Sequence, residues 1–240
     1  MRHLIITLFC LTSFACTKAP LPPNIHGDYV VLLHGIARSS SHMESLETYL
    51  HHQGFDVINL DYPSTKHDLQ TLIQGVHEDL STRLVLDKPT HFVGYSMGGL
   101  LVRAIAHKYP PQNRARVVQL APPNHGSEVA DFIQNNWLYK KIYGPAGQQL
   151  TTDTDLSNLL GEVNYELGII AGSRSIDPIS SFILPGRDDG KVTIASSKLD
   201  GMKDHIIVAA THTFFPSNKT VHRQTAHFLK HGTFQEHKNK

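Results

Sequence analysis

Cysteine is scarce in this 240-residue chain: the only two, Cys10 and Cys16, lie within its first sixteen residues. The rest of the chain therefore has no disulfide, no cysteine nucleophile and no thiolate metal site. An excess of one charge is also missing, because 22 Lys and Arg balance 21 Asp and Glu to a formal net charge of +1. A chain without a strong positive charge has no electrostatic attraction to nucleic acid, so we expect no nucleic-acid partner.

An apolar run long enough to span a bilayer comfortably is absent as well. The run at residues 4–14 has the length of a signal-peptide core and follows a short basic start. Ser13 and Ala15 are small residues at the two positions that a signal peptidase recognises, and Cys16 is the next residue. The segment 13–16 resembles a bacterial lipobox, although an aliphatic residue is usual at position 13. We therefore expect residues 1–16 to be a signal peptide or a lipoprotein signal.

Two alternatives stay open for this start. Cys16 is lipidated after cleavage and attaches the protein to a membrane, or the apolar run stays in place as an uncleaved anchor. We expect export to the bacterial periplasm, to a membrane as a lipoprotein, or by secretion. The proline-rich residues 17–27 predict an extended linker, which leaves residues 28–240 for the folded domain.

The body of the chain predicts one α/β domain. Hydrophobic residues make up 40% of the sequence and charged residues 18%, a composition that supports a proper core. Apolar runs typical of buried strands alternate with helical patterns, which predicts a mostly parallel sheet with helices on both faces. The expected strands are residues 29–33, 55–60, 90–93, 116–120, 166–171 and 205–209. The expected helices are residues 41–53, 68–86, 100–109 and 218–230.

One stretch, residues 126–164, is longer than a single crossover requires. It contains Trp137, Tyr139, Tyr143 and a Gly-Pro-Ala-Gly turn at residues 144–147. Either a small cap over the functional site or an ordinary helical excursion beside the sheet would account for it.

The most informative motif is Gly94-Tyr95-Ser96-Met97-Gly98, which has the pattern G-x-S-x-G between an expected strand and an expected helix. In that context the tight turn holds the serine in a strained conformation and presents its Oγ at the end of the strand. A glycine-rich strand-to-helix turn is the alternative without chemistry. The surrounding strand and helix favour Ser96 as a catalytic nucleophile.

A serine nucleophile needs a base, and the base needs an orienting acid. In enzymes with this elbow the acid and then the histidine follow the serine along the chain. His212 lies in the loop after the last expected strand, which makes it our candidate base. The other histidines beyond the serine are His125, His205, His222, His227 and His231. His227 and His231 are four apart and could share a metal, but exposed histidines on one helix face are the commoner explanation.

The acid is less certain from spacing alone. Asp188 and Asp189 lie next to each other in the loop before the last expected strand, where an orienting carboxylate is needed. Asp177 and Asp204 are further candidates. Adjacent aspartates in a surface turn, with no catalytic part, are the alternative.

An oxyanion hole needs two backbone N–H groups. Met97, the residue after the serine, is expected to supply one of them. The loop after the first expected strand is expected to supply the other, from Ile36, because Gly35 lets the backbone turn close to the site.

At these residues the chain resembles the α/β-hydrolase superfamily, and within it bacterial lipase- and esterase-like serine hydrolases. The resemblance runs from about Asp28 to Phe234. It rests on the first strand through His34-Gly35, on the serine motif, on residues 121–127, on Asp188-Asp189-Gly190-Lys191-Val192 and on Thr211-His212. In that family the acid is the aspartate directly before the glycine of a D-G-x-V loop, which corresponds to Asp189.

The resemblance implies an eight-stranded, mostly parallel sheet, an acyl-enzyme mechanism and no metal or organic cofactor. The chain departs from the family pattern in two respects. Its short N-terminal side leaves little chain for the first antiparallel strands, and its cap region is small. The resulting hypothesis is an exported serine esterase or lipase acting on a small-molecule or lipid ester. A thioesterase, amidase or acyltransferase with the same triad remains open, and a non-catalytic envelope binding module is a remote alternative.

Overall fold

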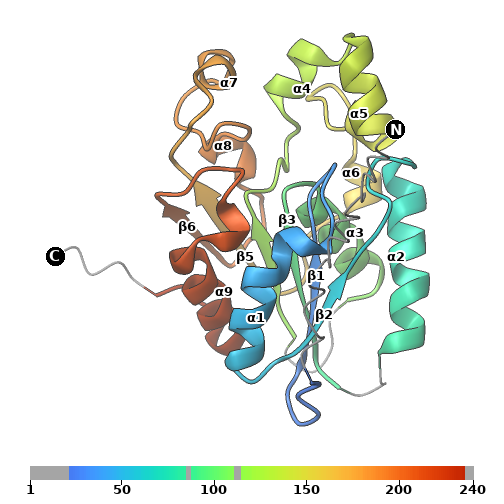
Figure 1. Cartoon of the computed structure of the whole chain (residues 1–240), viewed down its shortest axis with the longest axis vertical. Helices are drawn as coiled ribbons and strands as arrows, with labels where there is room; N and C mark the ends of the chain where they lie inside the picture. The colour runs from blue at the N-terminus through green and yellow to red at the C-terminus, as the bar shows by residue number, and fades with distance from the viewer. Residues whose placement is uncertain (1–21, 85–87, 111–114, 236–240) are drawn as a thin grey trace, which may run out of the picture.

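A six-stranded parallel sheet organises the computed structural model, which describes residues 22–84, 88–110 and 115–235 (Figure 1). The strand order is β2-β1-β3-β4-β5-β6, so that β3 lies inside the sheet and β2 and β6 form its edges. The strands are β1 Tyr29–Leu33, β2 Asp56–Leu60, β3 Thr90–Tyr95, β4 Val117–Leu120, β5 Leu167–Gly172 and β6 Asp204–Val208. Each expected strand is present, with ends that differ by at most two residues.

The described residues contain six strands rather than the eight implied by the resemblance, and all six are parallel, which agrees with the expected shortage of chain for the first antiparallel strands. Only residues 22–28 precede β1 in the described part of the chain, and they form a turn rather than a strand. The predicted signal at residues 1–16, with Cys16, lies outside the described residues, as does most of the predicted linker. In the ranges that the structure describes, no helix is both long and apolar enough to cross a membrane.

Helices cover both faces of the sheet, as the alternating pattern predicted (Figure 1). Side chains of β1 alternate between two apolar clusters: Val30 and Leu32 face one, and Val31 and Leu33 face the other. The first cluster includes side chains of two helices, α1 Glu44–His52 and α9 Lys219–His231. The second includes side chains of α2 Leu69–Arg83 and α3 Met97–Lys108. A strand buried on both faces needs apolar residues at every position, which is why β1 reads as a continuous run.

The helices that complete the layers follow the expected order. They are α1 Glu44–His52, α2 Leu69–Arg83, α3 Met97–Lys108, α4 Glu128–Ile133, α5 Trp137–Gln148, α6 Ser157–Leu160, α7 Pro178–Ile183, α8 Ile194–Ser197 and α9 Lys219–His231, with 3-10 turns at Ser40–Met43 and Phe215–Ser217. α7 and α8 have no counterpart in the sequence-based prediction, because helices of six and four residues are too short to show a 3.6-residue period.

The long stretch 126–164 forms α4, α5 and α6. α4 and α5 rise beyond the same end of the sheet as α7, and α4 contacts α7 (Figure 1). α5 is kinked at Gly144 and Pro145, and the N–H of Ala146 donates a hydrogen bond to the carbonyl of His67. The side-chain Oε1 of Gln149 also accepts from the N–H of Leu69, the first residue of α2, at 2.7 Å. These contacts tie the stretch to the loop between β2 and α2.

Candidate active site

Ser96 stands alone between β3 and α3, at the carboxyl edge of the sheet. Its φ of 54° and ψ of −123° lie in a region that non-glycine residues rarely adopt. The surroundings hold it there: its N–H donates to the carbonyl of Leu120 at 2.8 Å, and its carbonyl accepts from the N–H of Gly99 at 2.8 Å. α3 begins directly after it, at Met97 rather than at residue 100 as the sequence predicted. The turn therefore leads straight into a helix N-terminus, which favours negative charge beside Ser96.

Gly94 and Gly98, on either side of Ser96, lie so close to neighbouring backbone atoms that no side chain fits there. A Cβ on Gly94 would overlap the carbonyl of Gly98, and a Cβ on Gly98 would overlap the carbonyl of Leu33. The backbone of the turn is therefore packed against itself and against the end of β1. This crowding explains the glycines two residues before and two residues after Ser96.

His212 reaches Ser96 from the loop after β6. The distance from its Nε2 to the Ser96 Oγ is 3.1 Å. Two backbone contacts fix the loop: the His212 N–H donates to the Asp189 carbonyl at 2.8 Å, and the Tyr95 hydroxyl donates to the His212 carbonyl at 2.8 Å. Tyr95 was not predicted to support the site. Its position next to Ser96 in the motif was the sequence signal that could have indicated this role.

Asp189 lies on the other side of the imidazole. Its Oδ2 is 2.7 Å from the Nδ1 of His212, and its side chain is 1% exposed. Its Oδ1 accepts from the N–H groups of Lys191, at 3.0 Å, and Val192, at 2.8 Å. A carboxylate can only accept, so this geometry assigns the proton to Nδ1 and leaves the lone pair of Nε2 facing Ser96. The structure thus brings together Ser96, His212 and Asp189.

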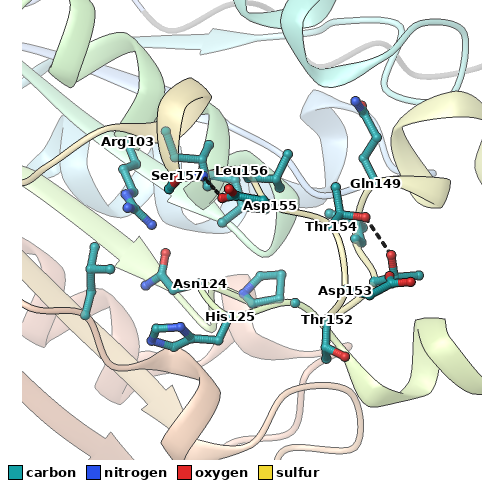
Figure 2. A pocket seen from close by; sticks show the side chains of 17 residues that line it. Arg103, Asn124, His125, Gln149, Thr152, Asp153, Thr154, Asp155, Leu156 and Ser157 are labelled. Carbon is teal, nitrogen blue, oxygen red and sulfur yellow. Dashed lines mark hydrogen bonds between the residues drawn. The ribbon is translucent and has the colours of Figure 1, made fainter.

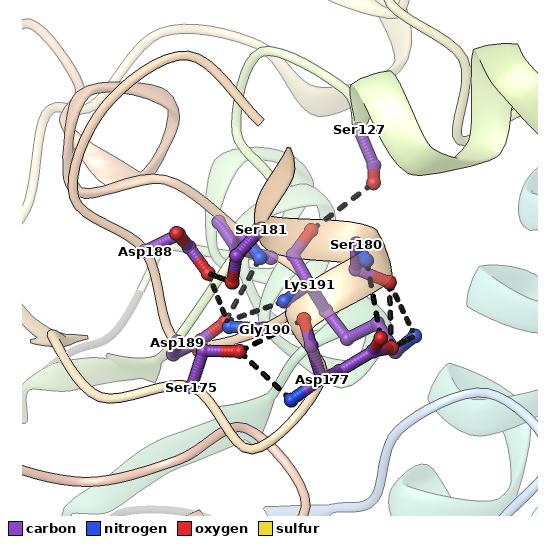
Figure 3. Close-up of polar contacts among 10 residues, drawn as sticks. Ser127, Ser175, Asp177, Ser180, Ser181, Asp188, Asp189, Gly190 and Lys191 are labelled. Carbon is purple, nitrogen blue, oxygen red and sulfur yellow. Dashed lines mark hydrogen bonds and ion pairs between the residues drawn. The ribbon is translucent and has the colours of Figure 1, made fainter. Parts of the chain in front are cut away.

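Asp188, the alternative acid, faces a different part of the molecule (Figure 3). Its Oδ1 accepts from the Ser181 hydroxyl and from the Gly190 N–H, both at 2.7 Å. The bond from Ser181 joins the turn to α7, and the bond from Gly190 lies within the turn. Of the two neighbouring aspartates, only Asp189 contacts the imidazole in the described part of the chain.

The remaining candidate acids also have structural partners. Asp177 caps α7 through the Ser180 N–H and pairs with Lys191 at 2.8 Å (Figure 3). The bond from the Lys191 ammonium holds the pKa of the Asp177 carboxyl well below its usual range. Asp204 accepts from the N–H groups of His205 and Phe234. None of these carboxylates lies at the imidazole.

Three of the competing histidines are engaged elsewhere, and His125 lines a pocket that does not contain Ser96. His205 contacts the Ser197 hydroxyl, His222 donates to the Pro216 carbonyl and His227 to the Thr233 carbonyl. His227 and His231 lie with ring centroids 4.4 Å apart. Within the ranges that the structure describes, no group of three His, Cys, Asp or Glu side chains could hold a metal ion, so this pair lacks a third ligand.

The expected oxyanion loop lies against the serine turn. A Cβ on Gly35 would come 3.2 Å from the Ser96 Cβ and 3.0 Å from the Tyr95 ring, so this glycine allows the close approach. Ile36 follows it and lines the same pocket as Ser96. No hydrogen bond in the described part of the chain uses the N–H of Ile36 or of Met97. Neither N–H therefore has an acceptor within the described residues, and Ile36 of the two lines the pocket.

His34 and Tyr62 brace this loop, a feature that the sequence analysis missed. Their rings stack with centroids 4.2 Å apart, and the Tyr62 hydroxyl donates to the His34 carbonyl. The His34 Nδ1 donates to the Gly35 carbonyl at 2.8 Å. The His34 Nε2 accepts from the Tyr62 N–H at 3.3 Å, and burial lowers the pKa of His34, which favours the neutral ring that this bond requires. The two residues are 28 positions apart, so no local pattern pairs them.

A pocket of about 130 Å³ opens beside Ser96. Its apolar wall comes mainly from α4 and α5, so this part of residues 126–164 covers the site as the expected cap does, whereas α6 packs beside α3 as the alternative predicted. The apolar and aromatic lining residues are Ile36, Val129, Ala130, Ile133, Tyr139, Tyr143, Leu150 and Val192. The site therefore combines a polar line of three side chains with a small apolar chamber.

Comparisons with known proteins agree with this architecture. The family model described as alpha/beta hydrolase fold matches residues 28–149. The lysosomal thioesterase PPT2 of Mus musculus is 26% identical over 230 residues, covering 81% of this chain and 75% of that protein. A lipase of Bacillus licheniformis in its mature form superposes with a TM-score of 0.65 at 21% identity, covering 89% of this chain and 95% of that one. A metagenomic carboxyl esterase gives a TM-score of 0.62 at 17% identity, with 82% and 68% covered.

Proposed function

Because this chain belongs to the α/β-hydrolase family, we propose that it is a serine hydrolase that cleaves carboxylic esters through an acyl-enzyme on Ser96. One observation carries the proposal: an unbroken line of two hydrogen bonds, 2.7 and 3.1 Å long, joins the Asp189 carboxylate, the His212 ring and the Ser96 hydroxyl. A relay of this kind, with the serine on a strained turn, is what nucleophilic catalysis by serine requires.

The chemistry follows from the positions of these atoms. The Ser96 Oγ attacks the ester carbonyl while its proton passes to the Nε2 of His212. Asp189 keeps the other proton on Nδ1 and stabilises the imidazolium that forms. The N–H groups of Ile36 and Met97 receive the oxyanion, and the N-terminus of α3 adds to the favourable field. His212 then protonates the leaving alcohol, and a water repeats the sequence to release the acid.

The size of the chamber supports short acyl groups. Pockets for drug-sized ligands usually enclose about 300–1,000 Å³, whereas the chamber beside Ser96 encloses about 130 Å³. We therefore propose that activity on p-nitrophenyl esters is greatest at acyl chains of about two to four carbons. A maximum at longer chains would indicate a lipase whose cap rearranges around its substrate.

The test is labelling and turnover by matched variants. Ser96→Ala should abolish both labelling by a fluorophosphonate probe and hydrolysis of p-nitrophenyl butyrate, while the variant unfolds at the same temperature as the natural chain. Ser81→Ala is the control, since Ser81 lies exposed on α2 and donates only to the Glu78 carbonyl. Undiminished labelling or turnover in Ser96→Ala would overturn the proposal.

Thioester hydrolysis is the second candidate, favoured by the similarity to the thioesterase PPT2. The three side chains serve either substrate, because the leaving group is bound by other parts of the site. Comparing kcat/KM for a butyryl ester and a butyryl thioester with equally acidic leaving groups separates the two. A preference above about tenfold for the thioester, or about 1.4 kcal/mol of transition-state binding, would assign the second function.

We also propose that the protein is exported, on the strength of the sequence of residues 1–16 alone. Mass spectrometry of the mature N-terminus after expression in a bacterial host tests this. A chain that begins at a diacylated Cys16 indicates a lipoprotein, and an intact Met1 contradicts processing.

A further inference from the structure

A second and larger pocket lies next to the catalytic chamber, on the side of α3 and α6 (Figure 2). It encloses about 450 Å³ and shares only Pro123 and Leu150 with the chamber beside Ser96. Neither Ser96, His212 nor Asp189 lines it. The proposed ester hydrolysis therefore leaves this pocket without a role.

Arg103 is the unusual residue of the pocket. It projects from α3 and is only 8% exposed, although it carries a permanent charge. Its Nη2 donates to the Gly161 carbonyl at 2.8 Å, but its Nε is buried without a hydrogen-bond partner. Across the described residues, no carboxylate pairs with its guanidinium within 4.0 Å.

Such an arrangement is costly without a ligand. A buried charge is unfavourable unless it is paired, and a buried donor without an acceptor loses the hydrogen bond that it makes with water in the unfolded chain. A guanidinium presents its N–H groups in a planar fork that matches the two oxygens of a carboxylate or phosphate. An oxyanion in the pocket would satisfy both the charge and the free donor.

The other walls indicate what accompanies the oxyanion. Leu100, Leu156 and Leu199 contribute apolar surface, and His125 and Ser157 contribute further polar atoms. Asp153 and Asp155 also line the pocket but are exposed, and the Asp155 carboxylate accepts from the Ser157 N–H at 2.9 Å. Two negative charges near the opening disfavour a polyanion. The walls therefore suit a small oxyanion that carries a short apolar body, rather than a polyphosphate.

We propose that this pocket is a binding site for a small amphipathic oxyanion, a carboxylate or a phosphate ester, held by Arg103. The site is separate from the catalytic chamber, so it is expected to bind whether or not Ser96 is a nucleophile. Binding is therefore measured on the full chain after Ser96 has been replaced by alanine as well as on the natural protein.

Isothermal titration with hexanoate, hexyl phosphate and hexanol tests the proposal. Hexanoate or hexyl phosphate should bind at least tenfold more tightly than hexanol, and the tighter of the two identifies the oxyanion. Arg103→Met, which keeps the apolar stem and removes the charge, should weaken that binding at least tenfold, and Arg103→Lys should restore part of it. Equal binding of hexanol, or unchanged binding in Arg103→Met, would overturn the site.

A second pair of variants covers the case in which Arg103→Met fails to fold. Ser157 is exposed and lines the pocket, so Ser157→Trp should obstruct it and abolish binding. Asn158→Trp places the same side chain one residue further along α6, at an exposed position that does not line the pocket. It should bind the oxyanion like the natural chain. Equal binding by both tryptophan variants, or no binding of any probe to the natural chain, would also refute the proposal.

Discussion

Replacing Asp189 with asparagine is expected to reverse the hydrogen-bond direction at the site without disturbing the fold. The Oδ1 of Asp189 accepts from the N–H groups of Lys191 and Val192, and these buried donors still need an acceptor in the variant. The amide oxygen must therefore take the Oδ1 position. The amide nitrogen is then left at the Oδ2 position, 2.7 Å from the Nδ1 of His212, where it can only donate.

The consequence is a histidine with the wrong tautomer. Nδ1 becomes the acceptor, so the proton moves to Nε2, which faces the Ser96 Oγ at 3.1 Å and can no longer accept its proton. A wrong tautomer of this kind costs on the order of 10⁴ in kcat. That factor corresponds to about 5 kcal/mol of lost transition-state stabilisation. The fold should tolerate the change, because the two side chains have the same shape.

Asp188→Asn is the matched control. Asparagine can accept from the Ser181 hydroxyl and the Gly190 N–H through its carbonyl oxygen, so kcat should fall less than about tenfold. The assay is initial-rate hydrolysis of p-nitrophenyl butyrate by both variants, with thermal unfolding as the check on folding. If Asp189→Asn stays within tenfold of the natural chain, or if Asp188→Asn is the slower variant, the reasoning fails.

Three further predictions concern the supports of the site and the stability of the fold. Gly98→Ala should lower the unfolding temperature by several degrees or prevent folding, because its Cβ overlaps the Leu33 carbonyl; an unchanged melting curve would contradict this. Tyr62→Phe removes the hydroxyl that donates to the His34 carbonyl. It should lower the free energy of unfolding in urea by about 1–3 kcal/mol and lower kcat more than it raises KM. Unaltered kinetics would show that the loop needs no such support. Burial lowers the pKa of four histidines below the ordinary 6.5: His34, His91, His205 and His222. As the pH falls below 6.5, the unfolded chain therefore binds more protons than the folded chain. The free energy of unfolding should therefore decrease from about pH 7.5 to about pH 5.5, and a flat or rising profile would refute this assignment.

Most strands and long helices were predictable because their signals are local. A strand buried on both faces, such as β1, needs an apolar side chain at every position, and a helix such as α9 shows its period over several turns. The start of α3 was placed too late, because Gly98 and Gly99 have low helix propensity. Tertiary packing overrides that preference, since only glycine fits where the turn approaches Leu33.

The supports of the site were not predictable, because their partners are distant in the sequence. Tyr62 reaches His34 from the loop after β2, and Tyr95 holds the carbonyl of His212 across 117 positions. Arg103 looks in the sequence like an ordinary polar residue on an apolar helix. Only the packing of α3 against the segment around Gly161 buries its charge.

The sequence by itself determined which residue types reach the carboxyl edge of the sheet and in what order. The strand, turn and helix around Ser96 are encoded by contiguous residues, and the loops that carry Ile36 and His212 follow recognisable strands. Spacing left Asp188 and Asp189 open because they share one loop and one chemistry; the family resemblance implied Asp189, and the tertiary structure places that residue against His212. Adjacent side chains in a turn point in different directions, and each is fixed by the donors that it meets. Asp188 meets α7, whereas Asp189 meets the N–H groups of its own turn and the ring of His212.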